Sequence, residues 1–304
     1  MQFHVPLPGN NRIPPHADWI LQLRAPDYQR IAGTIDDLGY EVISTSEHFV
    51  MPNFEVPRLG PYWTHALTVM AFMAGATKQA RVDAHVLVLP YHHPVALAKV
   101  VSTLDVLSGG RVNLSIGVGH AVKEFEILGL PFAERGKMTD EALELMKHCW
   151  ANPEPNFKGQ YFHIDEVAFE PAPVQQPVPI FVGGNSKAAR HQGWQPNPVT
   201  LTAADMGPSL EYIHSQPEFA GKEATFDVMM GLGMGPLAGN FPLFADASAS
   251  ERTGLRDYLV QAIGALASYG TTSTSFPAIP TKSIEDYLDA LAWFAEEVRP
   301  QLPA

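Results

Sequence analysis

The chain is poor in cysteine and in positive charge, and it has no long apolar run. Cys149 is the single cysteine among 304 residues, so no disulfide can form within the chain and a cytoplasmic location is expected. Lysine and arginine number 20 against 32 aspartate and glutamate residues, a formal net charge of −12. This balance disfavours nucleic acid or an anionic membrane surface as the main partner. No apolar segment approaches the length of a membrane span, so no membrane partner is expected.

What the chain does have is enough apolar residues for one large core. Hydrophobic residues make up 46% of the sequence. A length of 304 residues suits a single domain spanning 1–304, because neither an internal repeat nor a low-complexity linker marks a boundary. Cys149 follows Leu145 and Met146 in an apolar helical pattern, so we interpret it as a core residue and not as a nucleophile.

Strand and helix patterns alternate along the first two thirds of the chain. Expected strands are 3–7, 41–46, 82–89, 111–118 and 180–184, and expected helices are 28–38, 63–76, 94–107 and 134–150. This order predicts parallel strands joined by helices, as in an α/β barrel. In the strand 82–89, alternation places Val82, Ala84, Val86 and Val88 on one face.

The later part of the chain has weaker patterns. Residues 156–169 predict a hairpin around Lys158 and Gly159, followed by a proline-rich link over 171–179. The segment 197–250 is rich in Gly, Pro and Met, and we assign it to long loops. The end of the chain predicts a helix over 255–269, a strand over 271–276 and a helix over 284–298.

The segment 108–120 is the most informative one. Gly109 and Gly110 suit the turn that ends a helix. The strand that follows alternates branched residues with small or polar ones: Val112, Leu114, Ile116 and Val118 against Asn113, Ser115, Gly117 and Gly119. Such alternation is expected where a barrel strand packs helices outside and leaves room inside. Glycines at its carboxyl end would let a flat or anionic ligand approach the backbone.

Four predicted strands end in unusual residues. These ends are Ser46-Glu47-His48, the segment Leu89 to His93, Gly117-Val118-Gly119-His120, and Gly183-Gly184-Asn185-Ser186. Because the carboxyl ends of parallel barrel strands meet on one face, the sequence predicts a functional site there. Gly183 to Ser186 would present free N–H groups at a helix start, which suits a phosphate, or it would be an ordinary N-cap.

Histidines supply the candidate acid/base groups. Glu47 and His48 would be a general acid/base pair, although neighbouring strand residues point in opposite directions and need not touch. The alternative is a loop histidine that merely packs. His85 would point into the barrel if the valine face meets the helices, either as a functional group or as a hydrogen-bonded core residue.

We expect no metal at the strand ends. His48, His92, His93 and His120 invite a metal hypothesis, but their spacing matches no zinc motif. Three aromatic residues, Trp63, Tyr91 and Trp194, would stack on a ring or belong to the core.

Several of these segments together resemble the bacterial luciferase-like superfamily of flavin- and deazaflavin-dependent oxidoreductases, particularly members that use coenzyme F-420. The matching segments are 38–42, 46–49, 86–99, 107–119, 124–129, 132–136, 179–187 and the closing helix 283–300. The resemblance covers most of 1–190 and the last ~50 residues. It implies a (β/α)8 TIM barrel with inserted hairpin and loop segments, often a homodimer.

The resemblance also implies a site. The ring of coenzyme F-420 would lie at the barrel mouth beside His48, with Glu47 as a further catalytic candidate. A cis peptide bond would fall at His85-Val86. The remaining implied cofactor contacts are Tyr91, Gly117, Gly119, His120, Gly183, Gly184, Asn185 and Ser186.

The implied function is hydride transfer between coenzyme F-420 and a small organic substrate. The first alternative is a monooxygenase that uses reduced FMN and oxygen, since the same fold serves both. The second is a non-catalytic barrel whose flavin binding is weak or lost, because Ser186 reaches Gly193 in only seven residues where the family has a longer helix. The sugar-phosphate branch is disfavoured because Ala121 and Val122 stand where that branch has a glutamate.

Overall fold

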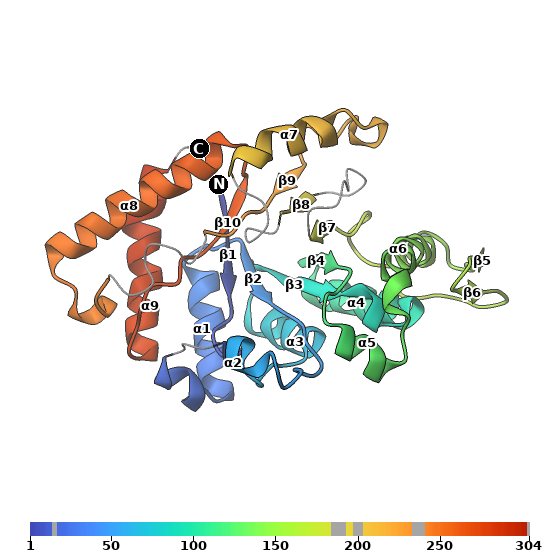
Figure 1. The fold of residues 1–304 in the computed structure, drawn as a ribbon, viewed down its shortest axis with the longest axis horizontal. Helices are drawn as coiled ribbons and strands as arrows, with labels where there is room; N and C mark the ends of the chain where they lie inside the picture. Colours follow the sequence, from blue (N-terminus) through green and yellow to red (C-terminus); the bar gives the residue numbers. More distant parts are fainter. Residues whose placement is uncertain (14–16, 184–192, 197–202, 233–240, 303–304) are drawn as a thin grey trace.

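The computed structural model describes residues 1–13, 17–183, 193–196, 203–232 and 241–302, and eight parallel strands form its centre (Figure 1). In chain order the strands are β1 (Gln2–Pro6), β2 (Val42–Thr45), β3 (Arg81–Val88), β4 (Val112–Gly117), β7 (Ile180–Gly183), β8 (Gly193–Gln195), β9 (Asp227–Val228) and β10 (Ser273–Ser275). They pair in the order β10-β1-β2-β3-β4-β7-β8-β9. The ring closes because Met229 bridges Ser273 in parallel and the Thr272 N–H donates to the Val228 carbonyl at 3.0 Å. This confirms the predicted barrel.

Helices surround the strands, with α1, α3 and α4 outside β1–β4 (Figure 1). The α-helices are α1 (Ala25–Asp37), α2 (Val56–Leu59), α3 (Ala66–Ala76), α4 (Pro94–Ser108), α5 (Val122–Leu128), α6 (Arg135–Ala151), α7 (Ala203–His214), α8 (Ala249–Ser268) and α9 (Ile284–Trp293), which a π-turn (Phe294–Val298) extends. Short 3₁₀ turns are η1 (Asp18–Gln22), η2 (Leu89–Tyr91), η3 (Phe132–Glu134), η4 (Pro217–Phe219), η5 (Phe244–Asp246) and η7 (Arg299–Gln301). No described helix combines the length and the apolar character needed to cross a bilayer.

The core lies between the strand ring and the helices. Val82, Leu114 and Ile116 are fully buried on the helix-facing side of neighbouring strands. Cys149 on α6 is buried in this core, as expected. Burial of such side chains is the main stabilising term, at about 25 cal/mol for each Å² of apolar surface removed from water.

The β3 side chains that face the helices are not all the predicted ones. Ala84 lies opposite Leu114, but the next paired residue, Leu87, lies opposite Ile116, so β3 has one extra residue over this stretch. Such a bulge reverses the alternation beyond it. Leu87 therefore joins Val82 and Ala84 in the core, and the placement of Val86 on that face is wrong.

The assignment of 197–250 to loops is also wrong in part. Helix α7 and strand β9 lie within this range. Met206, Leu210 and Ile213 recur at helical spacing and are buried, which is the pattern that forms α7. Gly207 and Pro208 within the helix obscured this pattern, because both residues have poor helix propensity.

The inserted hairpin forms as predicted. Strands β5 (Phe157–Lys158) and β6 (His163–Ile164) pair in antiparallel fashion. The Glu141 carboxylate on α6 holds the turn by accepting hydrogen bonds from the N–H groups of Gln160, Tyr161 and Phe162. The hairpin lies beside α6, on the opposite side of the molecule from α8 and α9 (Figure 1).

Candidate functional site

The four predicted strand ends lie on neighbouring strands. Because β2, β3, β4 and β7 are consecutive in the ring and parallel, their carboxyl ends form one edge, which we call the rim. Gly183 ends β7 at this rim. Gly184, Asn185 and Ser186, the predicted phosphate turn, lie outside the described residues, and so does the whole short segment between them and Gly193.

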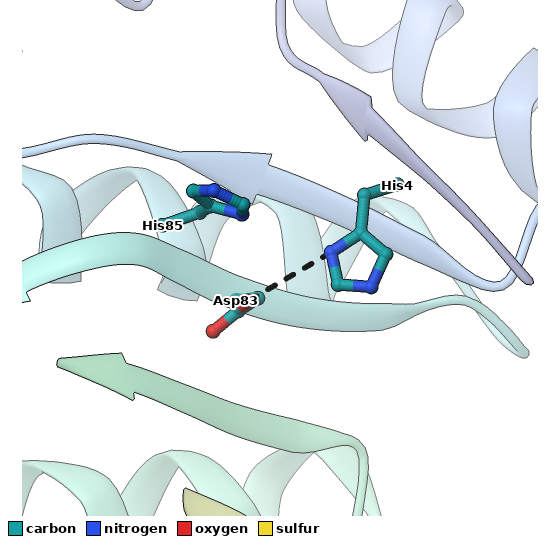
Figure 2. A group of neighbouring side chains, drawn as sticks. All are labelled: His4, Asp83 and His85. Carbon is teal, nitrogen blue, oxygen red and sulfur yellow. Dashed lines mark ion pairs between the residues drawn. The ribbon is translucent and has the colours of Figure 1, made fainter. Parts of the chain in front are cut away.

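His85 and Val86 are adjacent in β3, but their side chains lie in different places: His85 in the barrel interior and Val86 at the rim. Their peptide bond is cis, as the resemblance implied. The His85 ring lies 6.0 Å from the His4 ring, next to Asp83, inside the barrel (Figure 2). Val86 instead packs toward Gly117 and Gly183, where an added Cβ would come within 3.1 Å of its methyl groups. The side chain of Val86 is thus part of the rim floor, whereas His85 lies among interior polar groups.

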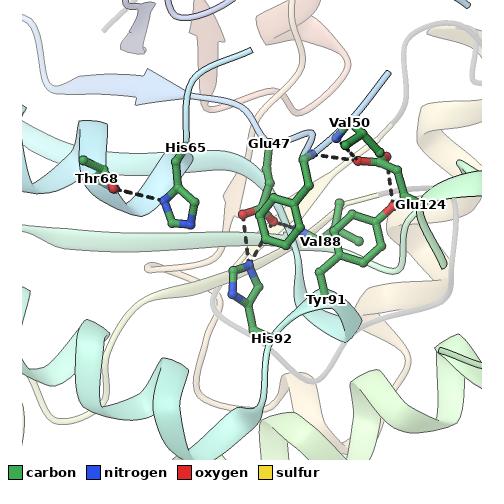
Figure 3. A network of polar contacts seen from close by, with 9 residues as sticks. Glu47, Val50, His65, Thr68, Val88, Tyr91, His92 and Glu124 are labelled. Carbon is green, nitrogen blue, oxygen red and sulfur yellow. Dashed lines mark hydrogen bonds and ion pairs between the residues drawn. The ribbon is translucent and has the colours of Figure 1, made fainter. Parts of the chain in front are cut away.

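His48, at the end of β2, is bonded to a carboxylate from a distant segment. Its Nδ1 lies 2.7 Å from Oε2 of Glu124, which is fully buried in the first turn of α5. The other carboxylate oxygen accepts the N–H groups of Phe49 at 2.7 Å and Val50 at 3.2 Å. The Tyr91 hydroxyl donates to Oε2 at 3.1 Å (Figure 3).

These hydrogen bonds determine the charge of Glu124. Burial by itself would raise its pKa, but the bonds from His48 and from the two backbone N–H groups outweigh burial and hold the pKa below its ordinary value. An ionised carboxylate only accepts, so Nδ1 of His48 is the donor. In the neutral ring, Nε2 then carries the free lone pair, which is the arrangement of a general base.

The rest of the His48 environment is aromatic. The Trp63 ring lies 4.6 Å away, edge to face, and the His120 ring 5.6 Å away. Partial desolvation and the neighbouring His48 lower the pKa of His120 below its ordinary value. His48, Trp63 and His120 therefore bring polar ring nitrogens and apolar ring faces together at the rim.

Glu47 pairs with His92 and not with its sequence neighbour. Its carboxylate is buried and accepts the Val88 N–H at 2.8 Å. Nε2 of His92 lies 3.0 and 3.1 Å from the two oxygens (Figure 3). The side chains of Glu47 and His48 thus have different partners and are not bonded to each other as a pair. Glu47 instead ties the end of β3 to the end of β2.

The glycines at the ends of β4 and β7 lie against other parts of the protein. Gly119 has a φ of +79°, and an added Cβ would lie 2.7 Å from Val88 and 2.9 Å from Phe125. At Gly183, an added Cβ would lie 3.1 Å from the carbonyl oxygen of Ile116. Backbone and the methyl groups of Val86 consequently form the surface between β4 and β7.

Sequence reasoning missed Glu124 as a functional residue and found no partner for His92. The signal at Glu124 was a carboxylate beside Phe125 in a short segment directly after the glycine-rich strand end. The four histidines grouped by sequence do not form one cluster. His48 and His120 lie together, with His48 bonded to Glu124, whereas His92 is bonded to Glu47 and His93, at the N-cap of α4, has its ring 5.7 Å from that of Phe162.

Comparison with known proteins gives the family. The model of the luciferase-like monooxygenase family matches residues 1–232. An uncharacterised Mycobacterium tuberculosis protein is 32% identical over 165 residues, covering 52% of this chain and 57% of that protein. The F-420-dependent glucose-6-phosphate dehydrogenase of Amycolatopsis mediterranei is 28% identical over 172 residues, covering 55% and 50%. An FMNH2-dependent dimethylsulfone monooxygenase of Pseudomonas putida is 31% identical over 129 residues, covering 41% and 35%.

Two solved structures share the fold over the whole chain. The monooxygenase RslO1 from Streptomyces bottropensis superposes with a TM-score of 0.78 at 21% identity, covering 99% of both chains. The coenzyme F-420-dependent tetrahydromethanopterin reductase from Methanopyrus kandleri superposes with a TM-score of 0.70 at 16% identity, also covering 99% of both. The chain aligns with roughly half the length or less of the named curated relatives. Because the family model spans 1–232, the chain belongs to the luciferase-like monooxygenase family.

Proposed function

We propose that this protein is an oxidoreductase that moves a hydride between coenzyme F-420 and a small organic substrate, with His48 as the acid/base group. The observation that carries the proposal is the 2.7 Å contact between His48 and the buried, ionised Glu124. A carboxylate on Nδ1 fixes the ring tautomer and leaves Nε2 to accept or return a proton. The named F-420-dependent relative supports the choice of cofactor.

The described residues fit a flat ring at the rim. The Val86 methyl groups lie over Gly117 and Gly183, so a flat ring at this surface would rest on Val86 and on the neighbouring backbone. Trp63 and His120 flank His48 and would exclude water from one side. Coenzyme F-420, when bound, supplies the hydride acceptor or donor, and the protein supplies orientation and the proton.

Within this site, the residues have distinct tasks. His48 would hold or release a proton at Nε2, and Glu124 would stabilise the imidazolium that forms after proton uptake. Tyr91 would hold Glu124 in place through its hydroxyl. Glu47 would hold the end of β3 in position by its bonds to His92 and to the Val88 N–H, and would not contact the substrate.

A second candidate function, a monooxygenase reaction, is supported by the comparisons. The named Pseudomonas putida relative uses FMNH2, and the fold is shared with a solved monooxygenase. The alternative is therefore a monooxygenase that uses reduced FMN and oxygen at the same rim. The non-catalytic alternative rested on the length of the segment after Ser186, which lies outside the described residues.

The experiment is a titration of the purified chain with coenzyme F-420 and with FMN, each oxidised and reduced. Ring fluorescence or absorbance reports binding. Micromolar or tighter binding of coenzyme F-420 without comparable binding of FMN supports hydride transfer. Preference for FMN favours the monooxygenase, and binding of neither favours the non-catalytic barrel.

We also propose a homodimer in the cytoplasm. The single buried cysteine is consistent with a reducing compartment. Leu107 on α4 is 79% exposed, and Val106 beside it and Phe72 on α3 are also exposed. Light scattering of the purified protein gives the mass and tests the dimer.

A further inference from the structure

Three potential metal ligands meet inside the barrel, beneath the rim. His4 on β1 and Asp83 and His85 on β3 each offer one ligand atom, and these atoms all lie within 4.8 Å of one another (Figure 2). His4 is 1% exposed and Asp83 is fully buried. His4 and Asp83 lie on different strands and far apart in the sequence, so the histidine groups considered from sequence did not include this one.

The His4 ring has no hydrogen-bond partner at either nitrogen, although both atoms are buried. Its Nδ1 lies 4.0 Å from Oδ2 of Asp83, which is too long for a hydrogen bond. Leaving a buried polar atom without a partner costs about 1–3 kcal/mol. Gln195, on β8, has a second unpartnered buried atom, Oε1. These atoms require a ligand or ordered water between the strands.

Asp83 is held in place by Ser115 on the neighbouring strand β4. Its Oδ1 accepts the Ser115 N–H at 2.9 Å, and its Oδ2 accepts the Ser115 hydroxyl at 2.7 Å. Ser115 is in turn fixed by the Gln195 amide, which donates to its Oγ at 2.6 Å. Each carboxylate oxygen keeps a lone pair for a further contact. Such outer hydrogen bonds are what orient a carboxylate that ligates a metal.

The charges around the group favour a cation. Asp83 is fully buried, and a carboxylate without a charged partner is disfavoured in such a place. His4 is buried, and His85 lies beside it with its side chain partly buried. Asp227 on β9 also interacts with His4 and offers a second negative charge. Arg81 also acts electrostatically on Asp83, but its guanidinium is bonded to Asn113 and Gln175.

We propose that His4, Asp83 and His85 bind one divalent transition-metal ion, with zinc as the first candidate, in the interior of the barrel. Two imidazoles and one carboxylate form a donor set that suits zinc and other first-row ions. Metal bonds of about 2.0–2.2 Å hold ligand atoms roughly 3–4 Å apart, so the group needs only a small contraction. A water molecule can complete the coordination.

The ion would connect β1 to β3 beneath Val86. Because Val86 lies between this group and the rim, the ion stabilises the barrel and does not contact the substrate. The proposal is independent of the proposed hydride transfer. It also replaces the expectation, drawn from the spacing of other histidines, that the chain binds no metal.

The test measures metal directly and needs no activity. The purified chain is treated with a chelator, loaded with Zn²⁺ or Co²⁺ and passed through gel filtration, and bound metal is counted by mass spectrometry. We expect about one ion per chain, a higher Tm for the loaded protein, and visible Co²⁺ absorption bands of a four- or five-coordinate site. Failure to retain either ion, together with an unchanged Tm, overturns the proposal.

Variants locate the ion. His4→Gln and His85→Gln should each lower retained metal at least about tenfold, in line with the loss of a ligand. His163→Gln, on the exposed hairpin beside Asp165, is the matched control and should retain full binding. Stoichiometric binding that survives in both interior variants, or that is lost in His163→Gln, contradicts the site. The Co²⁺ spectrum of the unchanged protein gives an independent answer if an interior variant does not fold.

Discussion

Glu124 on α5 reaches His48 at the end of β2 across 76 residues of sequence, with 2.7 Å between Oε2 and Nδ1. The same carboxylate accepts the N–H groups of Phe49 and Val50, the two residues after His48. One buried side chain therefore fixes both the ring of His48 and the backbone of the loop that carries it. The catalytic role of His48 and the structural role of Glu124 can therefore be tested with different variants.

His48→Ala should lower turnover at least ~10²-fold, the usual contribution of a general acid or base. Cofactor affinity should change little, because the expected contacts of His48 are with the reacting groups. Steady-state kinetics and cofactor titration of the same preparation provide both values. His163→Ala, which alters an exposed histidine, is the control. Unaltered turnover in His48→Ala would remove this residue from the mechanism.

Glu124→Gln should lower the free energy of unfolding by about 2 kcal/mol, because hydrogen bonds to a buried charged group contribute about 1.5–3 kcal/mol. Glu126→Gln is a matched control on the same helix, since Glu126 is exposed and forms a surface ion pair with Lys123. Urea unfolding of both variants measures the difference. Equal stability of the two variants would contradict the structural role.

The effect of Glu124 should depend on pH with a definite sign. Its pKa in the folded protein is below the ordinary value of 4.5. The ionised carboxylate therefore stabilises the fold above that ordinary value, and the contribution is lost as pH falls through the lowered pKa. The stability difference between the unchanged protein and Glu124→Gln should be full at pH 7 and shrink in acid. Unfolding curves across this range report it, and a gap that widens in acid would be inconsistent.

Most of the barrel could be predicted from the sequence because apolar periodicity differs between its strands and helices. The predicted helices and strands between 1 and 183 occur in the predicted order, with ends shifted by a few residues, but the short helices α2 and α5 were not predicted. The facing of β3 could not be predicted, because the extra residue between Ala84 and Leu87 is visible only against the register of β4. Helix α7 was missed because Gly207 and Pro208 interrupt an otherwise regular apolar stripe.

The candidate site could be predicted only at the level of strand ends. The order of the strands brings the ends of β2, β3 and β4 together, and this order was predictable. The partners were not, since a carboxylate in α5 and a histidine after β3 meet their targets only through the folded chain. The roles assigned to His48, Tyr91, Gly117 and His120 remain proposals.

Asp36→Asn should destabilise the protein by about 2 kcal/mol, since one carboxylate accepts three backbone N–H groups. Although burial acts to raise its pKa, these bonds, from residues 78–80, lower the pKa overall. Asp37→Asn changes the adjacent exposed residue and should alter stability by less than about 0.5 kcal/mol. Chemical unfolding of the pair is the measurement, and a similar loss in both would exclude the specific role of Asp36.

Gly119→Ala should cost more stability than Gly129→Ala, although both glycines have positive φ angles. At Gly129 nothing lies within 4 Å of an added Cβ, so only the backbone penalty of about 1 kcal/mol applies. At Gly119 the Cβ would lie 2.7 Å from Val88 and 2.9 Å from Phe125, which adds about 1–3 kcal/mol of overpacking. Thermal unfolding of the two variants measures how much the overpacking at Gly119 adds to the backbone penalty. Equal losses would show that Val88 and Phe125 move aside, and that Gly119 is required only for its backbone angle.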